Sequence, residues 1–160
     1  MSLGAHDYRS AYSSQCHPGR SMSILPNYAA PARLSAVGND LVGQKLLLMG
    51  RMMCYDSTTG FILLCDKDDA LLVDVTLCLD RSASIWVQDN FCSIQVIGHL
   101  EKCSAKLVAP ALPPHLIKLP KMDTRFVLRA IRVIPTFDVE QSTWNKLADQ
   151  VRMHAESELE

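Results

Sequence analysis

The sequence has 160 residues, of which 48% are hydrophobic and 21% charged, and its formal net charge is −1. This is the composition of a globular protein, and it excludes disorder along the whole chain. The longest uninterrupted apolar run, Phe61 to Cys65, is far shorter than the roughly 20 residues that a membrane-spanning helix needs. We therefore expect no membrane association.

The first forty residues differ in composition from the rest. They are rich in serine, contain Pro18, Pro26 and Pro31, and show no sustained periodicity. Such a segment buries too little apolar surface to offset the entropy lost on ordering. We expect a flexible tail over residues 1–23 and one domain over 24–160, closed by a helix over 139–157.

Three strands are predicted in the first half of the domain, separated by short polar turns typical of an antiparallel meander. Gly50 lies in the middle of the first strand and indicates a bulge or a tight bend. The predicted strands cover residues 44–55, 61–65 and 70–79.

A short helix is predicted over 83–87, followed by a strand over 91–102. In that strand Ile94, Val96, Gly98 and Leu100 alternate with polar residues, which indicates one buried face. A last strand is predicted over 126–134. The segment between these strands, 104–123, holds four prolines, so we expect a functional or disordered loop, or an extension of the preceding strand.

The chain ends in a predicted amphipathic helix. Asp138 is expected at its N-cap, with Gln141 completing a capping box. Asn145 is placed off the apolar stripe. This stripe indicates a face that packs either on the chain's own barrel or on a partner. It consists of Trp144, Leu147, Ala148, Val151 and Ala155.

Five strands, a helix after the third and a terminal helix are the elements of an OB fold, a five-stranded β-barrel, here with a C-terminal α-helix. Other small barrels of five or six strands remain alternatives. Because the fold alone does not define an activity, function must come from the barrel's surfaces and loops.

Several segments resemble the Ten subunit, the smallest member of the CST telomere complex and a relative of the smallest subunit of replication protein A. They are Leu48-Met49-Gly50-Arg51-Met52-x-x-Tyr55-Asp56, Phe61-Ile62-Leu63-Leu64 and Ile94-Gln95-Val96-Ile97-Gly98-His99-Leu100, then a strand leading to a helix centred on Trp144. The resemblance covers about residues 24–155. The long N-terminal tail and the proline-rich loop depart from the family pattern, so no loop contacts are carried over.

The resemblance implies a nuclear, non-enzymatic subunit of a complex on telomeric single-stranded DNA, active in telomere capping and lagging-strand fill-in. It would bind the OB domain of a Stn-type partner as a heterodimer, with a larger third subunit as a further partner. A replication protein A-type trimer, or another scaffold in DNA repair, is the alternative. The partner-binding residues expected on the helix are Trp144, Leu147, Ala148, Val151 and Met153.

Charge along the sequence argues against tight DNA binding by the chain alone. Asp66, Asp68, Asp69 and Asp74 surround a single Lys67 on the second and third strands, where OB folds bind single strands. Residues 99–137 carry seven basic and two acidic side chains. We expect this basic region either to make weak, salt-dependent contact with the phosphate backbone of DNA, or to be a solvated face that binds no DNA. The candidate nucleic-acid residues are Lys102, Lys106, Lys118, Lys121, Arg125 and Arg129, with Tyr55 as a stacking platform.

An enzyme is the competing hypothesis. The candidate metal cluster is Asp66, Asp68 and Asp69 with His99 or His115, although such a run of aspartates is typical of a turn. The sequence has no glycine-rich phosphate loop and no Gly-x-Ser-x-Gly motif. Its six cysteines include no Cys-x-x-Cys pair. We expect no catalytic activity, no metal and no cofactor.

Overall fold

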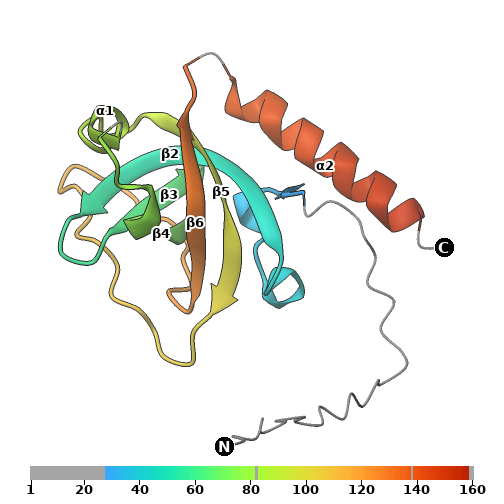
Figure 1. Ribbon diagram of the computed structural model, residues 1–160, viewed down its shortest axis with the longest axis horizontal. Coiled ribbons are helices and arrows are strands. Elements are labelled where there is room, and N and C mark those ends of the chain that lie inside the picture. The colour runs from blue at the N-terminus through green and yellow to red at the C-terminus, as the bar shows by residue number, and fades with distance from the viewer. Residues whose placement is uncertain (1–27, 82, 138, 159–160) are drawn as a thin grey trace, which may run out of the picture.

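The computed structural model describes residues 28–158 except 82 and 138. Five of the six strands of its sheet close into a barrel, and the short first strand pairs with the second outside this ring. The predicted tail, residues 1–23, and the predicted N-cap, Asp138, lie outside the described residues. Figure 1 shows the barrel with helix α2 lying along one side. The strands are β1 (Ala30–Pro31), β2 (Lys45–Asp56), β3 (Phe61–Asp66), β4 (Asp69–Asp74), β5 (Ser93–Lys102) and β6 (Phe126–Pro135). The helices are the short 3-10 helices η1 (Leu34–Ala36), η2 (Asn39–Leu41) and η3 (Thr76–Cys78), then α1 (Ala83–Val87) and α2 (Gln141–Ser157).

Strand order identifies the barrel as the OB fold predicted from the sequence. Neighbouring strands run in the order β1-β2-β3-β4-β6-β5, and β2 also pairs with β5, which closes the ring. All of these pairings are antiparallel except β4 with β6 and the short β1 with β2. One long strand, β2, thus joins both sides of the barrel.

The barrel core confirms the predicted alternation. Ile94, Val96 and Leu100 of β5 point inward, as do Ile62 and Leu64 of β3, and all are fully buried. Burying such an aliphatic side chain stabilises the fold by about 1.5 to 3 kcal/mol. Trp86 of α1 is also part of this core, so the predicted short helix covers one end of the barrel.

Gly50 is required by close packing. Of the two alternatives predicted for this position, a bulge or a tight bend, the bulge was wrong. The irregularity in the β2–β3 register lies between Met52 and Cys54. At Gly50 a Cβ atom would lie 2.8 Å from the backbone oxygen of Cys65 and 2.9 Å from Leu64. The glycine lets the long strand pass close to β3.

The third predicted strand was too long. Strand β4 ends at Asp74, and the residues after Val75 form η3. The Asp74 side chain accepts hydrogen bonds from the backbone N–H of Thr76 at 3.0 Å and from its hydroxyl at 2.7 Å. This aspartate turn satisfies local backbone groups and ends the strand despite the apolar residues that follow.

The proline-rich connection between β5 and β6 packs on the outside of the barrel. Buried side chains on the outer face of the sheet, including Leu63, Cys65 and Leu72, form a second apolar cluster with Leu107 and Leu112 of the connection. The connection is also held by backbone hydrogen bonds, from Leu107 to Thr124 and from Ala70 to Lys121. The proposed extension of β5 through residues 106–108 was wrong, because β5 ends at Lys102.

Helix α2 begins at Gln141, two residues later than predicted. Glu140 is the N-cap and makes no side-chain capping hydrogen bond. The predicted capping box pairs Gln141 with Asp138, which lies outside the described residues. Among the described residues, no helix is long and apolar enough to cross a membrane.

Candidate functional site

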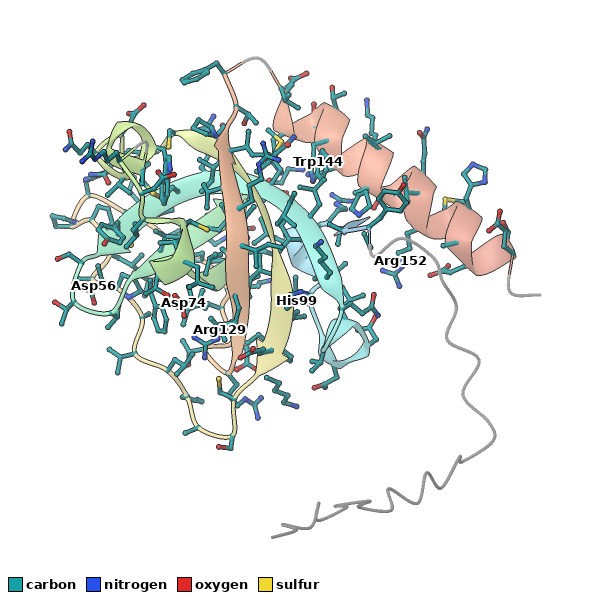
Figure 2. The ribbon with its side chains drawn as sticks, in the orientation of Figure 1. Asp56, Asp74, His99, Arg129, Trp144 and Arg152 are labelled. Carbon is teal, nitrogen blue, oxygen red and sulfur yellow. The ribbon has the colours of Figure 1, made fainter. Side chains whose placement is uncertain are left out.

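Helix α2 is fixed to the barrel by one face that carries both apolar and polar contacts. Trp144 and Ala148 are buried, and Figure 2 shows Trp144 pointing from the helix toward the barrel. Gln141 Nε2 donates to the backbone oxygen of Met49 at 3.0 Å, and Asn145 Nδ2 donates to Asp66 Oδ2 at 2.8 Å. One turn later, Asp149 forms a salt bridge of 2.9 Å with Arg33. These polar residues recur every four positions and so share one side of the helix.

The five predicted partner-binding residues therefore do not form one surface. Trp144 is 6% exposed and Ala148 is buried, so both pack on the chain's own barrel. Leu147 and Val151 are exposed to 49% and 40% and lie one turn apart on a flank of the helix. Met153, at 70%, lies about 120° round the helix from Leu147.

A groove of about 350 Å³ runs between α2 and the segment that precedes β2. Its walls carry small or apolar side chains, including Ala32, Ala36 and Val151. Its rim is charged, with the Arg33–Asp149 salt bridge and a second one of 2.9 Å between Arg152 and Glu156. Small wall residues let another chain approach closely, and the rim offers charges of both signs.

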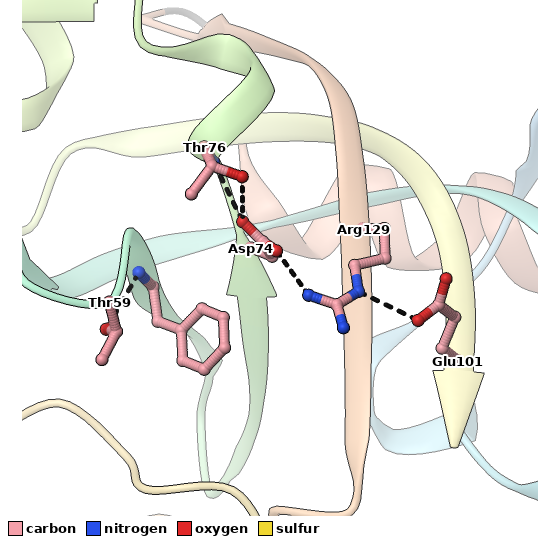
Figure 3. A network of polar contacts seen from close by, with 6 residues as sticks. Thr59, Asp74, Thr76, Glu101 and Arg129 are labelled. Carbon is pink, nitrogen blue, oxygen red and sulfur yellow. Dashed lines mark hydrogen bonds and ion pairs between the residues drawn. The ribbon is translucent and has the colours of Figure 1, made fainter. Parts of the chain in front are cut away.

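Most of the predicted nucleic-acid-binding cations are already engaged. Arg129 lies between Asp74 and Glu101 in the network of Figure 3. Lys118 forms a salt bridge of 2.8 Å with Asp68, and Arg125 forms one with Asp123. Lys102 Nζ lies 2.6 Å from Asn39 Oδ1. Among the described residues, Lys106 and Lys121 form no salt bridge.

The pKa values of the paired carboxyl groups reflect this engagement. Hydrogen bonds from Arg125 lower the pKa of Asp123 to about 2. Burial acts to raise the pKa of Asp74, but hydrogen bonds from Thr76 and Arg129 outweigh it, so this pKa lies below its ordinary value. The hydrogen bond with Glu101 in turn raises the pKa of Arg129. Arg129 is therefore a structural cation that joins β4, β5 and β6.

The face on which OB folds bind single strands is covered in this chain. That face includes the central strands and the loop between the last two strands. Here Leu107, Leu112 and Met122 of that loop pack over the outer side chains of β3 and β4. Tyr55, the predicted stacking platform, packs against the barrel core and is half-buried.

No group of three His, Cys, Asp or Glu side chains within the described part of the chain is arranged to hold a metal ion. Of the candidate cluster, Asp66 accepts a hydrogen bond from Asn145, and Asp68 is paired with Lys118. His115 lies instead beside the ring of Phe91, with centroids 5.5 Å apart. Burial raises the pKa of the Cys65 thiol to about 12, which disfavours the thiolate that metal binding and nucleophilic attack need.

Sequence reasoning missed the polar residues that orient α2. Asn145 was placed off the apolar stripe, yet it is buried and bonds to Asp66. The sequence did contain a signal for this polar face. Gln141 and Asp149 lie four residues before and four residues after Asn145, and residues at this spacing lie on the same face of a helix. Their partners are distant in the sequence and could not be read from it.

Comparisons with known proteins agree with the barrel topology. No protein-family model matches the sequence, and no curated protein matches it. A chain of the S. pombe Stn1–Ten1 complex superposes with a TM-score of 0.55 and 12% identity, over 79% of this chain and 93% of that one. The telomere capping protein Ten1 from S. pombe gives a TM-score of 0.53 and 13% identity, over 79% and 99%.

A putative aspartyl-tRNA synthetase from Leishmania major gives a lower TM-score of 0.49 at 12% identity, over 77% of this chain and 24% of that one. The chain thus shares its fold with the two S. pombe structures, and it matches almost their full length.

Proposed function

We propose that this chain is the small OB-fold subunit of a telomere-capping complex and binds a Stn-type OB-fold partner as a heterodimer. The likeness to Ten1 over nearly that protein's full length supports this proposal. A nuclear location at telomeres, a larger third subunit and a part in lagging-strand fill-in belong to the same proposal. The chain itself would act as a scaffold and not as an enzyme.

The observation that carries the proposal is the exposed apolar flank of α2. Leu147 and Val151 remain exposed although their helix is already fixed to the barrel by Trp144. Every described residue from Val151 to Glu158 is exposed, so the end of the helix is available for a second contact. The adjoining groove, with small residues such as Ala32 and Ala36, gives a partner helix space to pack.

The test is coexpression of the full chain with the Stn-type subunit of the same organism, followed by size-exclusion chromatography with mass determination. We expect a one-to-one complex. Leu147→Asp and Val151→Asp should each weaken it by about 2 kcal/mol or more, since they place a charge in a desolvated apolar contact. Gln150→Asp is the matched control, because Gln150 is an exposed residue of the same helix.

Two results would contradict the proposal. One is a complex that withstands both substitutions on the α2 flank. The other is a stable trimer with replication protein A-type subunits and no complex with the Stn-type protein, which would support the replication alternative.

We further propose that the isolated chain adds only weak contact with single-stranded DNA, through the loop lysines Lys106, Lys118 and Lys121. Their charge is partly offset by nearby carboxylates such as Asp68 and Asp123. Filter binding over a salt series should show an affinity that falls steeply as salt rises. Tight binding that is insensitive to salt would contradict the weak, electrostatic contact.

A further inference from the structure

A second cavity, of about 620 Å³, lies where β2, β3, the proline-rich connection and the first turn of α2 meet. It is separate from the groove beside the end of α2, and none of the residues that line one also lines the other. Its volume is within the range of small-molecule sites. Of the residues that line it, the function proposed above uses only Lys118.

The floor of the cavity is built by strand pairing and carries both polar and apolar side chains. Arg51 of β2 pairs with Cys65 of β3 on one side and with Ser93 of β5 on the other, so the three residues lie side by side. Met53 and Cys65 contribute the apolar surface, and Leu116 of the connection also lines the cavity. A planar apolar group would be desolvated against these side chains.

Cationic side chains lie at the rim. Arg51 is exposed and forms no salt bridge with any described residue, and the same holds for Lys67 in the β3–β4 turn. Of the two carboxylates that line the cavity, Asp66 accepts the hydrogen bond from Asn145, and Glu140 precedes α2. A guanidinium such as that of Arg51 can bind phosphate oxygens in a bidentate manner.

Phe91 is the most unusual lining residue. Its φ of 72° is in the left-handed region, which is unfavourable for a bulky side chain. Two hydrogen bonds hold this turn, from Phe91 N to Met52 O at 2.7 Å and from Met52 N to Cys92 O at 3.0 Å. The ring lies beside His115, with 53° between the planes, and Phe91 is still 39% exposed. Backbone strain that presents an aromatic side chain at a cavity is typical of a functional position.

We propose that this cavity binds one unpaired nucleotide of a single strand, with the base against Phe91 and the phosphate at Arg51 and Lys67. Base stacking on an aromatic side chain together with a basic channel is the general means of holding single strands. The inference rests on the nucleic-acid part of the proposed function and is independent of partner binding through α2. It gives single-strand contact a defined place at the edge of the covered face, where Cys65 and Asp66 of β3 line the cavity.

The test is fluorescence anisotropy of the full chain with a short labelled oligothymidylate at low salt. Phe91→Leu keeps an apolar side chain but removes the stacking surface, and Arg51→Gln removes the charge. We expect each to weaken binding by about tenfold. Arg132→Gln is the control for charge, because Arg132 is an exposed arginine on β6 that does not line this cavity. Urea unfolding of each variant verifies that it folds.

A second readout uses ultraviolet crosslinking of the same oligonucleotide to the unmodified chain. Crosslinks in the peptide that contains Phe91 support the proposal without any substitution. The proposal requires a crosslink at Phe91 when the oligonucleotide is present alone. If added thymidine monophosphate reduces this crosslink, a free nucleotide is sufficient to occupy the cavity. If it does not, the cavity binds a nucleotide only as part of a strand.

Three results would overturn the inference. Folded Phe91→Leu and Arg51→Gln variants that bind as tightly as the unmodified chain would exclude a nucleotide site at Phe91 and Arg51 and leave the loop lysines as the contact. An equal loss in Arg132→Gln would show that only overall charge matters. Absence of any binding would reject the nucleic-acid part of the proposed function as well, whereas partner binding would still be judged by the α2 variants.

Discussion

Asn145 on α2 donates its side-chain amide to Asp66 Oδ2 at the end of β3, across 2.8 Å and 79 positions of sequence. Both Asn145 and the neighbouring Trp144 are buried. The hydrogen bond fixes the rotation of α2 about its own axis, because an amide shielded from water must keep its partner. That rotation in turn leaves Leu147 and Val151 exposed.

Removing this contact should loosen the helix. We expect Asn145→Ala to lower the free energy of unfolding by about 1 to 2 kcal/mol, since it deletes a buried hydrogen bond to a charged group. Urea unfolding measures the loss, and hydrogen exchange should show faster exchange within α2 than within the barrel. The control is Gln150→Ala on the exposed side of the helix. Equal stability of the two variants would contradict this role for Asn145.

Gly98 should tolerate no side chain. A Cβ atom there would lie 2.4 Å from the backbone oxygen of Arg129, where β5 and β6 pair. We expect Gly98→Ala to cost about 3 kcal/mol, because the two backbones must separate. Gly43→Ala is the comparison: Gly43 has a φ of 83° but open space around it, so about 1 kcal/mol is expected. Thermal or urea unfolding of both variants distinguishes a steric from a conformational requirement.

The Asp74–Arg129 pair should contribute stability that acid removes. Because the pKa of Asp74 is lower in the folded chain than its ordinary value of 3.8, its contribution is complete above about that pH. It declines as the pH falls through the lower, folded value. We expect a coupling of about 1 kcal/mol at neutral pH, since the arginine is partly solvated.

A double-mutant cycle with Asp74→Asn and Arg129→Gln measures this coupling by urea unfolding at neutral and at acid pH. A coupling of the same size at both ends of the pH range would rule out the ion pair as its source.

The buried thiols under the proline-rich connection should resist alkylation. Burial raises the pKa of Cys65 to about 12 and also raises that of Cys54, so neither is a thiolate at pH 8. Peptide mapping after brief iodoacetamide treatment should find both unmodified in the native chain and modified after unfolding.

Leu112→Asp should raise the alkylation rate of Cys65 by about tenfold, because the leucine no longer holds the connection on the sheet. Val108→Asp is the control in the same connection, since Val108 is exposed. If both substitutions leave Cys65 equally protected, the connection does not control access to this face.

The hydrophobic periodicity of the sequence was sufficient to predict the barrel. The strict alternation of Ile94, Val96, Gly98 and Leu100 placed one face inward, and the structure confirms it. Local turn chemistry was harder to predict, since Asp74 ends its strand although apolar residues continue to Leu79. The apolar stripe on α2 was equally ambiguous, because a sequence does not say which part of a wide stripe the chain covers itself.

The sequence by itself determined an OB fold with a terminal helix, because residue periodicity and short turns are local properties that survive whatever packs around them. Only the tertiary structure decided which surfaces remain for ligands. It buried Trp144 and Ala148, paired Arg129 with Asp74 and Glu101, and covered the sheet face with residues 103–125. These outcomes depend on contacts between residues far apart in the chain, and such contacts follow from three-dimensional closure of the barrel.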